Sequence, residues 1–447
     1  MPFVITYFIL FLWVILCIVA RKPLLLLLIV TLLPFQLLIK TLFDLANNSG
    51  SIISIWKELG ILVLFLRVLI EEIHDKKNST ISSNNNFPVM LFFLIICVTA
   101  SYLIVSDYFS DALVTAKVII FPILFGYTVS KLILSANDVK SIVKMMLISS
   151  FVCFITAYIQ YFFLNYEFAF FFNVAENISD TGEIVFTQSA SKIMGFDRMY
   201  GVFGGPNELG LFTSLLALFI LSILLYDRYQ KLIRSKLYLY ILITFAFSVL
   251  FLTFSRSSWI FLLIGIVVLS TRKGVGHFFL KIFFTFLFLA TLALVFVQLF
   301  PDLTDIYSKT LTLEEGSAKG RPDEFVIGME KVLENPMGLG LGKVIYRSNH
   351  PIFQTEIFWW MVLLEIGLIG GILLFGLQFS VLFRISSLFK KQFLNPFTIT
   401  SFCCCAAFLV TGFGSTIVAE PVFLTFLWLI IGMGINNNVN NILYQSV

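Results

Sequence analysis

The feature that most constrains this chain is a succession of apolar runs about 20 residues long, separated by short charged or turn-forming segments. Hydrophobic residues make up 59% of the sequence and charged residues only 13%, against about 25% charged residues in a soluble domain. An apolar run of this length crosses the hydrocarbon core of a bilayer as a helix. The pattern predicts an integral membrane protein. It excludes soluble enzymes, nucleic-acid-binding proteins and disulfide scaffolds.

The apolar runs predict an all-α fold, a polytopic helical bundle with about 12–13 spans. The thirteen expected spans are 3–20, 23–42, 52–70, 87–106, 112–134, 140–164, 207–226, 237–254, 257–271, 279–300, 357–383, 397–413 and 420–435. They divide the chain into N-terminal spans (1–164), a first external loop (165–206), spans that include the Arg256 turn (207–300), a large external loop (301–356), and C-terminal spans with a tail (357–447). The apolar N-terminus is expected to be a retained span, because no basic segment or small-residue cleavage site marks it as a removable signal.

The distribution of Lys and Arg predicts the orientation of the spans. Eighteen of the thirty lie in turns that alternate as one face, which the positive-inside rule makes cytoplasmic: Arg21, Lys22, Arg67, Lys76, Lys77, Lys131, Lys140, Lys144, Arg228, Lys231, Arg234, Lys236, Arg272, Lys273, Lys281, Arg384, Lys390 and Lys391. The loops 165–206 and 301–356 then lie on the outer face, and both are mildly acidic. Loops of this length between spans are uncommon without a function.

The second of these loops contains a predicted amphipathic helix. Arg321-Pro322-Asp323-Glu324 has Pro in the first turn and acids at the positive end of the helix dipole, and Asn335-Pro336 with the glycines that follow ends the helix. Apolar residues recur between these signals at helical spacing: Phe325, Met329, Val332 and Leu333. We expect this helix to lie on the outer surface of the membrane.

Three arginines on the outer side, where the Lys/Arg rule disfavours a cation, are candidate binding residues: Arg198, Arg256 and Arg321. A guanidinium stays charged and donates bidentate hydrogen bonds to a diphosphate. The alternatives are a snorkelling side chain for Arg256, and ion pairs with Asp197 and Asp323 for Arg198 and Arg321. Two or three arginines at the outer leaflet would suit a lipid-linked diphosphate.

Glu356 and His350 are candidate bases. Glu356 comes just before an apolar run, where partial desolvation suits a carboxylate to general-base work; the alternative is an acid favoured by a helix dipole. His350 is the only histidine expected outside, but Pro351 places it in an extended loop.

Other charged and glycine-rich positions give weaker indications. Lys117 and the pair Lys57-Glu58 lie in the outer halves of spans and are expected to snorkel or neutralise one another rather than to line a cavity. Glu365 and Glu420 receive no role. The segment Gly338–Gly342 lacks the preceding strand and the Lys-Ser/Thr of a phosphate-binding loop. The sequence contains no metal-binding motif, so neither a metal nor another cofactor is expected.

Four segments in this order resemble the O-antigen polymerase and O-antigen ligase superfamily. They are Arg198-Met-Tyr-Gly-Val-Phe-Gly-Gly-Pro-Asn207-Glu-Leu-Gly, Thr253-Phe-Ser-Arg256-Ser-Ser-Trp, Gly320-Arg321 leading to Glu334-Asn-Pro-Met-Gly-Leu-Gly, and Glu365-Ile-Gly-Leu-Ile-Gly. The resemblance covers about residues 195–371, and the first 190 residues match only as apolar spans. It implies a helical membrane glycosyltransferase with a large periplasmic loop.

The resemblance also implies roles for individual residues. Arg198, Arg256 and Arg321 match arginines that contact the lipid diphosphate, and Asn207 falls in the first motif as a substrate-binding residue. The position eleven residues before Gly367 is Glu356, which resembles the Glu of the polymerases rather than the His of the ligases. His350, followed by Pro, departs from the ligase pattern.

The resulting hypothesis is a polysaccharide polymerase for O-antigen, capsule or exopolysaccharide, in the inner membrane of a bacterium with its active site facing the periplasm. The expected partners are an undecaprenyl-diphosphate-linked oligosaccharide, membrane lipids and a chain-length regulator protein, with no nucleic acid. The first alternative is a ligase that transfers finished polymer to lipid A core. The second is a flippase for the same lipid, which would need a polar path to the cytoplasmic side.

Overall fold

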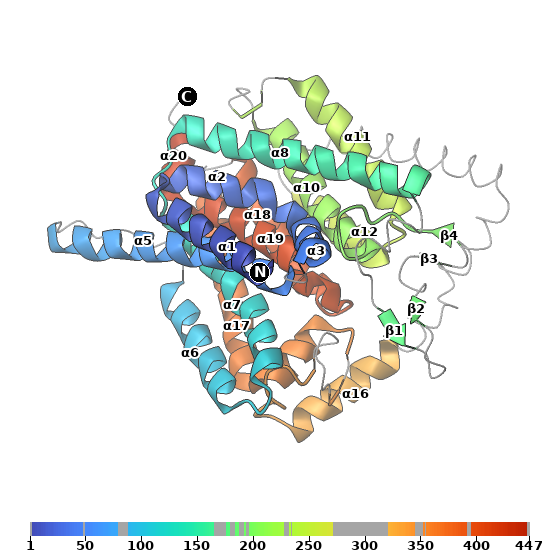
Figure 1. Cartoon of the computed structure of the whole chain (residues 1–447). Coiled ribbons are helices and arrows are strands. Elements are labelled where there is room, and N and C mark those ends of the chain that lie inside the picture. The colour runs from blue at the N-terminus through green and yellow to red at the C-terminus, as the bar shows by residue number, and fades with distance from the viewer. Residues whose placement is uncertain are drawn as a thin grey trace.

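The computed structural model describes residues 2–47, 50–78, 88–164, 176–178, 184–186, 192–193, 196–227, 232–233, 235–270, 321–344, 352–353, 355–390 and 395–444. These residues are almost entirely helical (Figure 1). The expected first external loop holds two short antiparallel strand pairs: β1 (Glu176–Ile178) with β2 (Ile184–Phe186), and β3 (Lys192–Ile193) with β4 (Phe196–Asp197). The expectation of an all-α bundle is therefore confirmed, and these two short strand pairs are an addition that the sequence did not predict.

The N-terminal half of the bundle follows the predicted spans. Its helices are α1 (Pro2–Val19), α2 (Lys22–Leu32), α3 (Gln36–Asn47), α4 (Gly50–Ile53), α5 (Trp56–Asn78), α6 (Val89–Val105), α7 (Phe109–Lys131) and α8 (Ala136–Ile159). A single 3-10 turn at Leu33–Phe35 joins α2 to α3, because Pro34 interrupts the α-helical hydrogen bonds. Ser135 and Asp138 form a reciprocal capping box that fixes the start of α8.

The C-terminal half contains eight described helices. They are α10 (Pro206–Tyr226), α11 (Lys236–Leu252), α12 (Arg256–Ser270), α16 (Arg321–Glu334), α17 (Phe358–Lys390), α18 (Pro396–Thr411), α19 (Pro421–Ile435) and α20 (Asn437–Tyr444). Three of them begin with proline at the first helical position, where the missing N–H costs no hydrogen bond: α10, α18 and α19.

The core lies around α10 and α19, whose side chains are buried on nearly every face. Small residues let α19 pack closely against α7. A Cβ added to Gly432 would lie 2.6 Å from the carbonyl oxygen of Gly126, and one added to Gly126 would lie 2.9 Å from the carbonyl oxygen of Trp428. Close packing at small residues is typical of helix pairs in membranes.

Five helical segments are long and apolar enough to cross a membrane: Lys22–Asp44, Phe109–Lys131, Ala136–Leu164, Pro206–Tyr226 and Phe358–Leu388. The pair Pro421–Ile435 and Asn437–Leu443, bent by 68°, is a sixth when counted as one span. Shorter apolar helices within the described ranges are Val4–Val19, Val89–Val105, Lys236–Leu252, Arg256–Ser270 and Pro396–Thr411. The chain is thus consistent with a helical membrane protein. The larger number of 12–13 spans stays a prediction, and the span expected at 279–300 lies outside the described residues.

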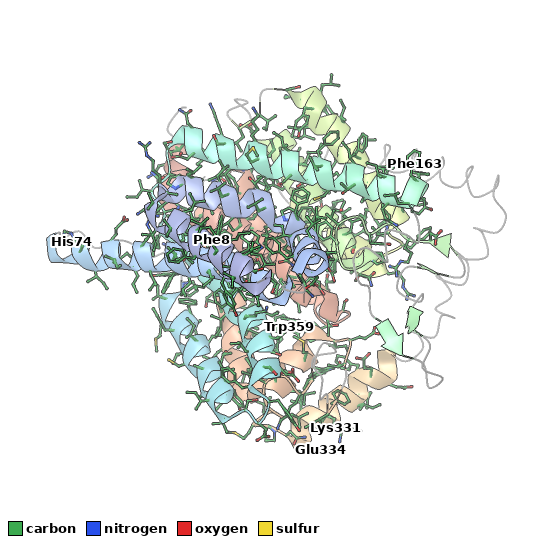
Figure 2. The ribbon with its side chains drawn as sticks, viewed as in Figure 1. Phe8, His74, Phe163, Lys331, Glu334 and Trp359 are labelled. Atoms are coloured by element: carbon green, nitrogen blue, oxygen red, sulfur yellow. The ribbon has the colours of Figure 1, made fainter. Side chains whose placement is uncertain are left out.

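Two labelled residues show how the ends of the helices are arranged. His74, from an expected cytoplasmic turn, and Phe163, at the start of an expected outer loop, lie on opposite sides of the molecule (Figure 2). Figure 1 shows β1–β4 and α12 toward the Phe163 side, and α20 toward the His74 side. We refer to the Phe163 side, the expected external face, as the outer side; that it faces the periplasm stays a prediction.

Candidate functional site

Two hydrogen bonds fix Arg198 at the junction of two other candidate segments. Its buried guanidinium donates from Nε to the carbonyl oxygen of Thr253 at 2.8 Å, and from Nη2 to Oδ1 of Asn207 at 2.8 Å. Thr253 lies three residues before Arg256, in the turn that links α11 to α12. The structure therefore joins two predicted site residues, Arg198 and Asn207, to the turn that carries a third, Arg256.

Buried backbone contacts hold the segment that carries Arg198 in place. Oε1 of Gln160, at the end of α8, accepts hydrogen bonds from the backbone N–H of Tyr200 at 3.0 Å and of Gly201 at 3.2 Å. Gly201 has a φ of 57°, and a Cβ there would lie 2.9 Å from the Cβ of Ala157. This tight turn requires glycine, and it fixes the approach of Arg198 to α10.

The first turns of α10 and α12 lie side by side. Oγ of Ser258 donates to the carbonyl oxygen of Asn207 at 3.4 Å, and a Cβ added to Gly210 would lie 2.5 Å from Oγ of Ser258. Pro206 opens one helix and Arg256 opens the other. Two helix N-termini, each the positive end of a helix dipole, therefore meet beside two arginines, an arrangement suited to an anion.

Glu324, in the first turn of α16, holds the segment that carries Glu356. Its Oε1 accepts hydrogen bonds from Oγ1 of Thr355 at 2.7 Å and from the backbone N–H of Glu356. These contacts place Glu356 beside the start of α16, which begins at Arg321 as predicted. The side chain of Glu356 is exposed, so the expectation of a partly desolvated carboxylate is wrong. The reason is that α17 begins only at Phe358 and leaves Glu356 in the connecting segment.

The helix predicted in the second external loop is present, and it packs on α17. Gly328 lies against the ring of Trp360, and the ring of Phe325 contacts the same ring in a tilted arrangement, with centroids 5.1 Å apart and an interplanar angle of 60°. The predicted apolar stripe divides between two environments: Val332 is buried, whereas Leu333 is 70% exposed. The helix is therefore a docked element whose outward side is also apolar.

The loop after α16 enters a break in α17. Gly367 has a φ of 69° and a ψ of 176°, which interrupts the helix. The backbone N–H of Leu339 donates to the carbonyl oxygen of Leu364 at 2.5 Å, and the N–H of Leu368 donates to the carbonyl oxygen of Pro336 at 2.9 Å. Backbone groups freed by the break thus find partners in the loop, as a membrane interior requires.

Glu365 fastens this loop, a role that the sequence did not reveal. Its fully buried carboxylate accepts hydrogen bonds from the backbone N–H of Gly342 and, at 2.8 Å, from that of Val344. The one indication in the sequence is a carboxylate inside a long apolar run, which is costly without partners. Glu365 therefore ties the loop that follows α16 to the broken span.

Some predicted site groups lie outside the described residues: His350 and the side chain of Arg321. Within the described ranges, no group of three or more His, Cys, Asp and Glu side chains is arranged to hold a metal ion. The buried cysteines Cys17, Cys153 and Cys403–Cys405 are free thiols.

Comparison of the chain with models of known protein families finds no match, and neither does comparison with curated proteins. The family resemblance therefore rests on the sequence motifs alone.

Proposed function

We propose that this protein polymerises a polysaccharide from undecaprenyl-diphosphate-linked repeat units at the periplasmic face of the bacterial inner membrane. A growing glycan on the lipid diphosphate is the donor. The non-reducing end of a single lipid-linked repeat unit is the acceptor. Each cycle forms one glycosidic bond and releases the donor's undecaprenyl diphosphate.

The observation that carries the proposal is the junction of Arg198, Asn207 and the Arg256 turn. It combines two helix N-termini with two guanidinium groups on the outer side of a helical membrane protein. Phosphate oxygens favour such N-termini and the planar donor fork of arginine. In the proposed reaction Arg256, with Arg198 and Arg321, stabilises the charge that develops on the leaving diphosphate.

Glu356 acts as the general base in this proposal. Its exposed position beside the first turn of α16 leaves the carboxylate accessible to an incoming sugar hydroxyl. A single displacement at the anomeric carbon, with the proton passing to Glu356, predicts inversion of configuration. A diphosphate is already a good leaving group, so no second carboxylate is needed as an acid, unlike in glycoside hydrolysis. The lipid supplies the activation, so the proposed reaction is metal-independent.

The roles can be tested with purified variants and a lipid-linked repeat unit. Arg256→Ala is expected to lower the rate of chain extension by about 10²–10³-fold, the usual effect of losing a charge-stabilising donor. Glu356→Gln is expected to lower it by about 10²–10⁴-fold. The matched control is Glu334→Gln, an exposed acid at the far end of α16. Full activity of Glu356→Gln would refute the base assignment, and His350→Ala would then be tested.

The phenotype of a deletion strain separates the polymerase from its rivals. A single repeat unit on the lipid A core indicates a lost polymerase, whereas long polymer accumulating on the carrier lipid indicates a lost ligase. Flipping of the lipid by purified protein in liposomes, without formation of polymer, would favour the flippase.

A further inference from the structure

A second polar cluster lies among α3, α5 and α7, elements that contribute none of the residues assigned above. Oε1 of Glu58 lies 3.6 Å from Nζ of Lys57 and 3.9 Å from Nζ of Lys117. Nζ of Lys57 also donates to Oε1 of Gln36. The side chains of Lys57 and Glu58 are 9% and 10% exposed, and that of Lys117 is 28% exposed. Lys117 therefore forms the accessible edge of the cluster.

The distance of the cluster from the expected cytoplasmic ion pairs follows from its position along two helices. On α5 Glu58 lies thirteen residues from Glu71, and on α7 Lys117 lies fourteen residues from Lys131. Both separations correspond to about 20 Å at a rise of 1.5 Å per residue. Glu71 and Lys131 belong to the expected cytoplasmic layer of ion pairs. With Glu71 and Lys131 at the expected cytoplasmic boundary and both helices along the membrane normal, this distance places the cluster in the outer third of a hydrocarbon core about 30 Å thick.

The cluster places two cations beside one carboxylate oxygen. Oε1 of Glu58 lies within ion-pair distance of both Lys57 and Lys117, and interactions between such charges are stronger in a region of low dielectric than in water. Ionisable groups at this depth are costly and indicate function.

Two polar groups in the cluster also lack hydrogen bonds. Oε2 of Glu58 is buried without a partner among the described residues. Nζ of Lys117, at 3.9 Å from Glu58, is beyond hydrogen-bond distance. The ammonium group of Lys117 thus offers donors and positive charge to an anion, and Oε2 of Glu58 offers an acceptor to a hydroxyl group. A phosphate that carries a sugar meets both requirements.

We propose that Lys57, Glu58 and Lys117 bind the phosphorylated sugar headgroup of the acceptor lipid. This inference rests on the proposed function, which requires two lipid diphosphates at once. The donor's diphosphate lies at the reacting carbon, beside the arginines. The acceptor reacts through its non-reducing end, so its own diphosphate must lie away from the arginines by the length of a repeat unit. A second, separate anion site is therefore required.

Contacts of α7 connect this cluster to the segment that carries the proposed base. A Cβ on Gly342 would lie 2.7 Å from the backbone of α7 at Ala112, and Nζ of Lys343 lies 3.1 Å from Asp107 just before that helix. Lys117 is five residues, about 8 Å, further along α7 than Ala112. The loop between α16 and α17 therefore packs on the same helix, one to two turns from the proposed acceptor site.

The test counts bound lipids on purified protein in phosphatidylcholine nanodiscs by native mass spectrometry, with undecaprenyl-diphospho-N-acetylglucosamine as the probe. The wild-type chain is expected to bind two molecules. The double variant Lys57→Gln/Lys117→Gln is expected to bind one, and Arg256→Ala is expected to bind one at the other site. Lys117→Gln alone, at the most exposed position, is expected to weaken one site by about tenfold, the effect of one charge-assisted hydrogen bond. Lys131→Gln, on the same helix, is the control and keeps both sites.

The outcomes separate this inference from the proposed function. Two bound molecules in both the Lys117→Gln and the double variant, at wild-type affinity, would overturn the acceptor site. Two bound molecules in Arg256→Ala would overturn the arginine site while leaving the acceptor site intact. Displacement of the probe from Arg256→Ala by an equal amount of phosphatidylglycerol would identify a general phospholipid site and overturn the assignment to a glycan lipid.

Discussion

Replacing Glu365 should loosen the connection between α16 and α17. The carboxylate is fully buried and accepts hydrogen bonds from the backbone N–H groups of Gly342 and Val344. A hydrogen bond to a charged group contributes about 1.5–3 kcal/mol, so Glu365→Ala, which removes both, is expected to cost about 3–6 kcal/mol of unfolding free energy. Glu365→Gln keeps one acceptor oxygen, and about half of that loss is expected.

The assay is equilibrium unfolding of the purified protein in detergent, together with hydrogen exchange at the amides of residues 338–344. We expect faster exchange in this loop before any change in α10 or α19, because the loop loses its anchor first. Glu334→Gln is the matched control: its ion pair with Lys331 is exposed and contributes less than about 1 kcal/mol. A Glu365→Ala protein no less stable than the control, with unchanged exchange in the loop, would refute the reasoning.

Three further predictions concern the loops on the outer side. Gly342→Ala should destabilise the protein by more than about 1 kcal/mol in the same unfolding assay, because φ is 82° and the added Cβ meets the backbone of α7. Gly376→Ala should not, because its Cβ would make only ordinary contacts with Leu91 at 3.9–4.0 Å. Burial and a neighbouring carboxylate raise the pKa of Tyr200 from 10.0 to about 12, so the wild type should lose stability as pH rises from 10 to 12, and Tyr200→Phe should show a shallower loss. Arg198→Lys should lower thermal stability and chain extension together, since an ammonium cannot reproduce both of the guanidinium's bonds, and unchanged values would contradict its anchoring role.

The predicted helix boundaries agree with the observed ones where residues close together in the sequence determine them. The apolar runs predict α7, α8 and α10 to within a few residues, because length and hydropathy suffice to define a membrane helix. The start of α16 at Arg321 was predicted from the proline and acids that follow it, and its end from Asn335-Pro336. These signals act within one turn of helix, so no tertiary information is needed.

Contacts between distant segments were not predictable in the same way. Glu365 acts on amides more than twenty residues away, and its role depends on a loop conformation that composition does not reveal. The strands around Asn177 and Val185 were missed because two-stranded pairs of three residues leave little periodicity to detect. Glu356 was expected to be partly desolvated at the end of a span, but α17 begins only at Phe358 and the carboxylate is exposed.

The sequence predicted which residues of the candidate site lie on one face, but it did not predict the contacts between them. The distribution of Lys and Arg predicted that Arg198 and Arg256 lie on the outer face. Only the structure shows that Arg198 donates hydrogen bonds to the turn before Arg256 and to Asn207. The sequence also paired Lys57 with Glu58 as neighbours that neutralise one another. The structure adds Lys117 to the same carboxylate oxygen, a contact that the sequence did not predict.

The central claim is tested most directly by reconstitution of the purified wild-type protein in liposomes with an undecaprenyl-diphosphate-linked repeat unit facing the outer side. We predict a ladder of products that differ by one repeat unit, all still attached to lipid, with one undecaprenyl diphosphate released for each bond formed. A repeat unit that stays unextended in the presence of correctly folded protein, or one that only changes leaflet, would contradict the account.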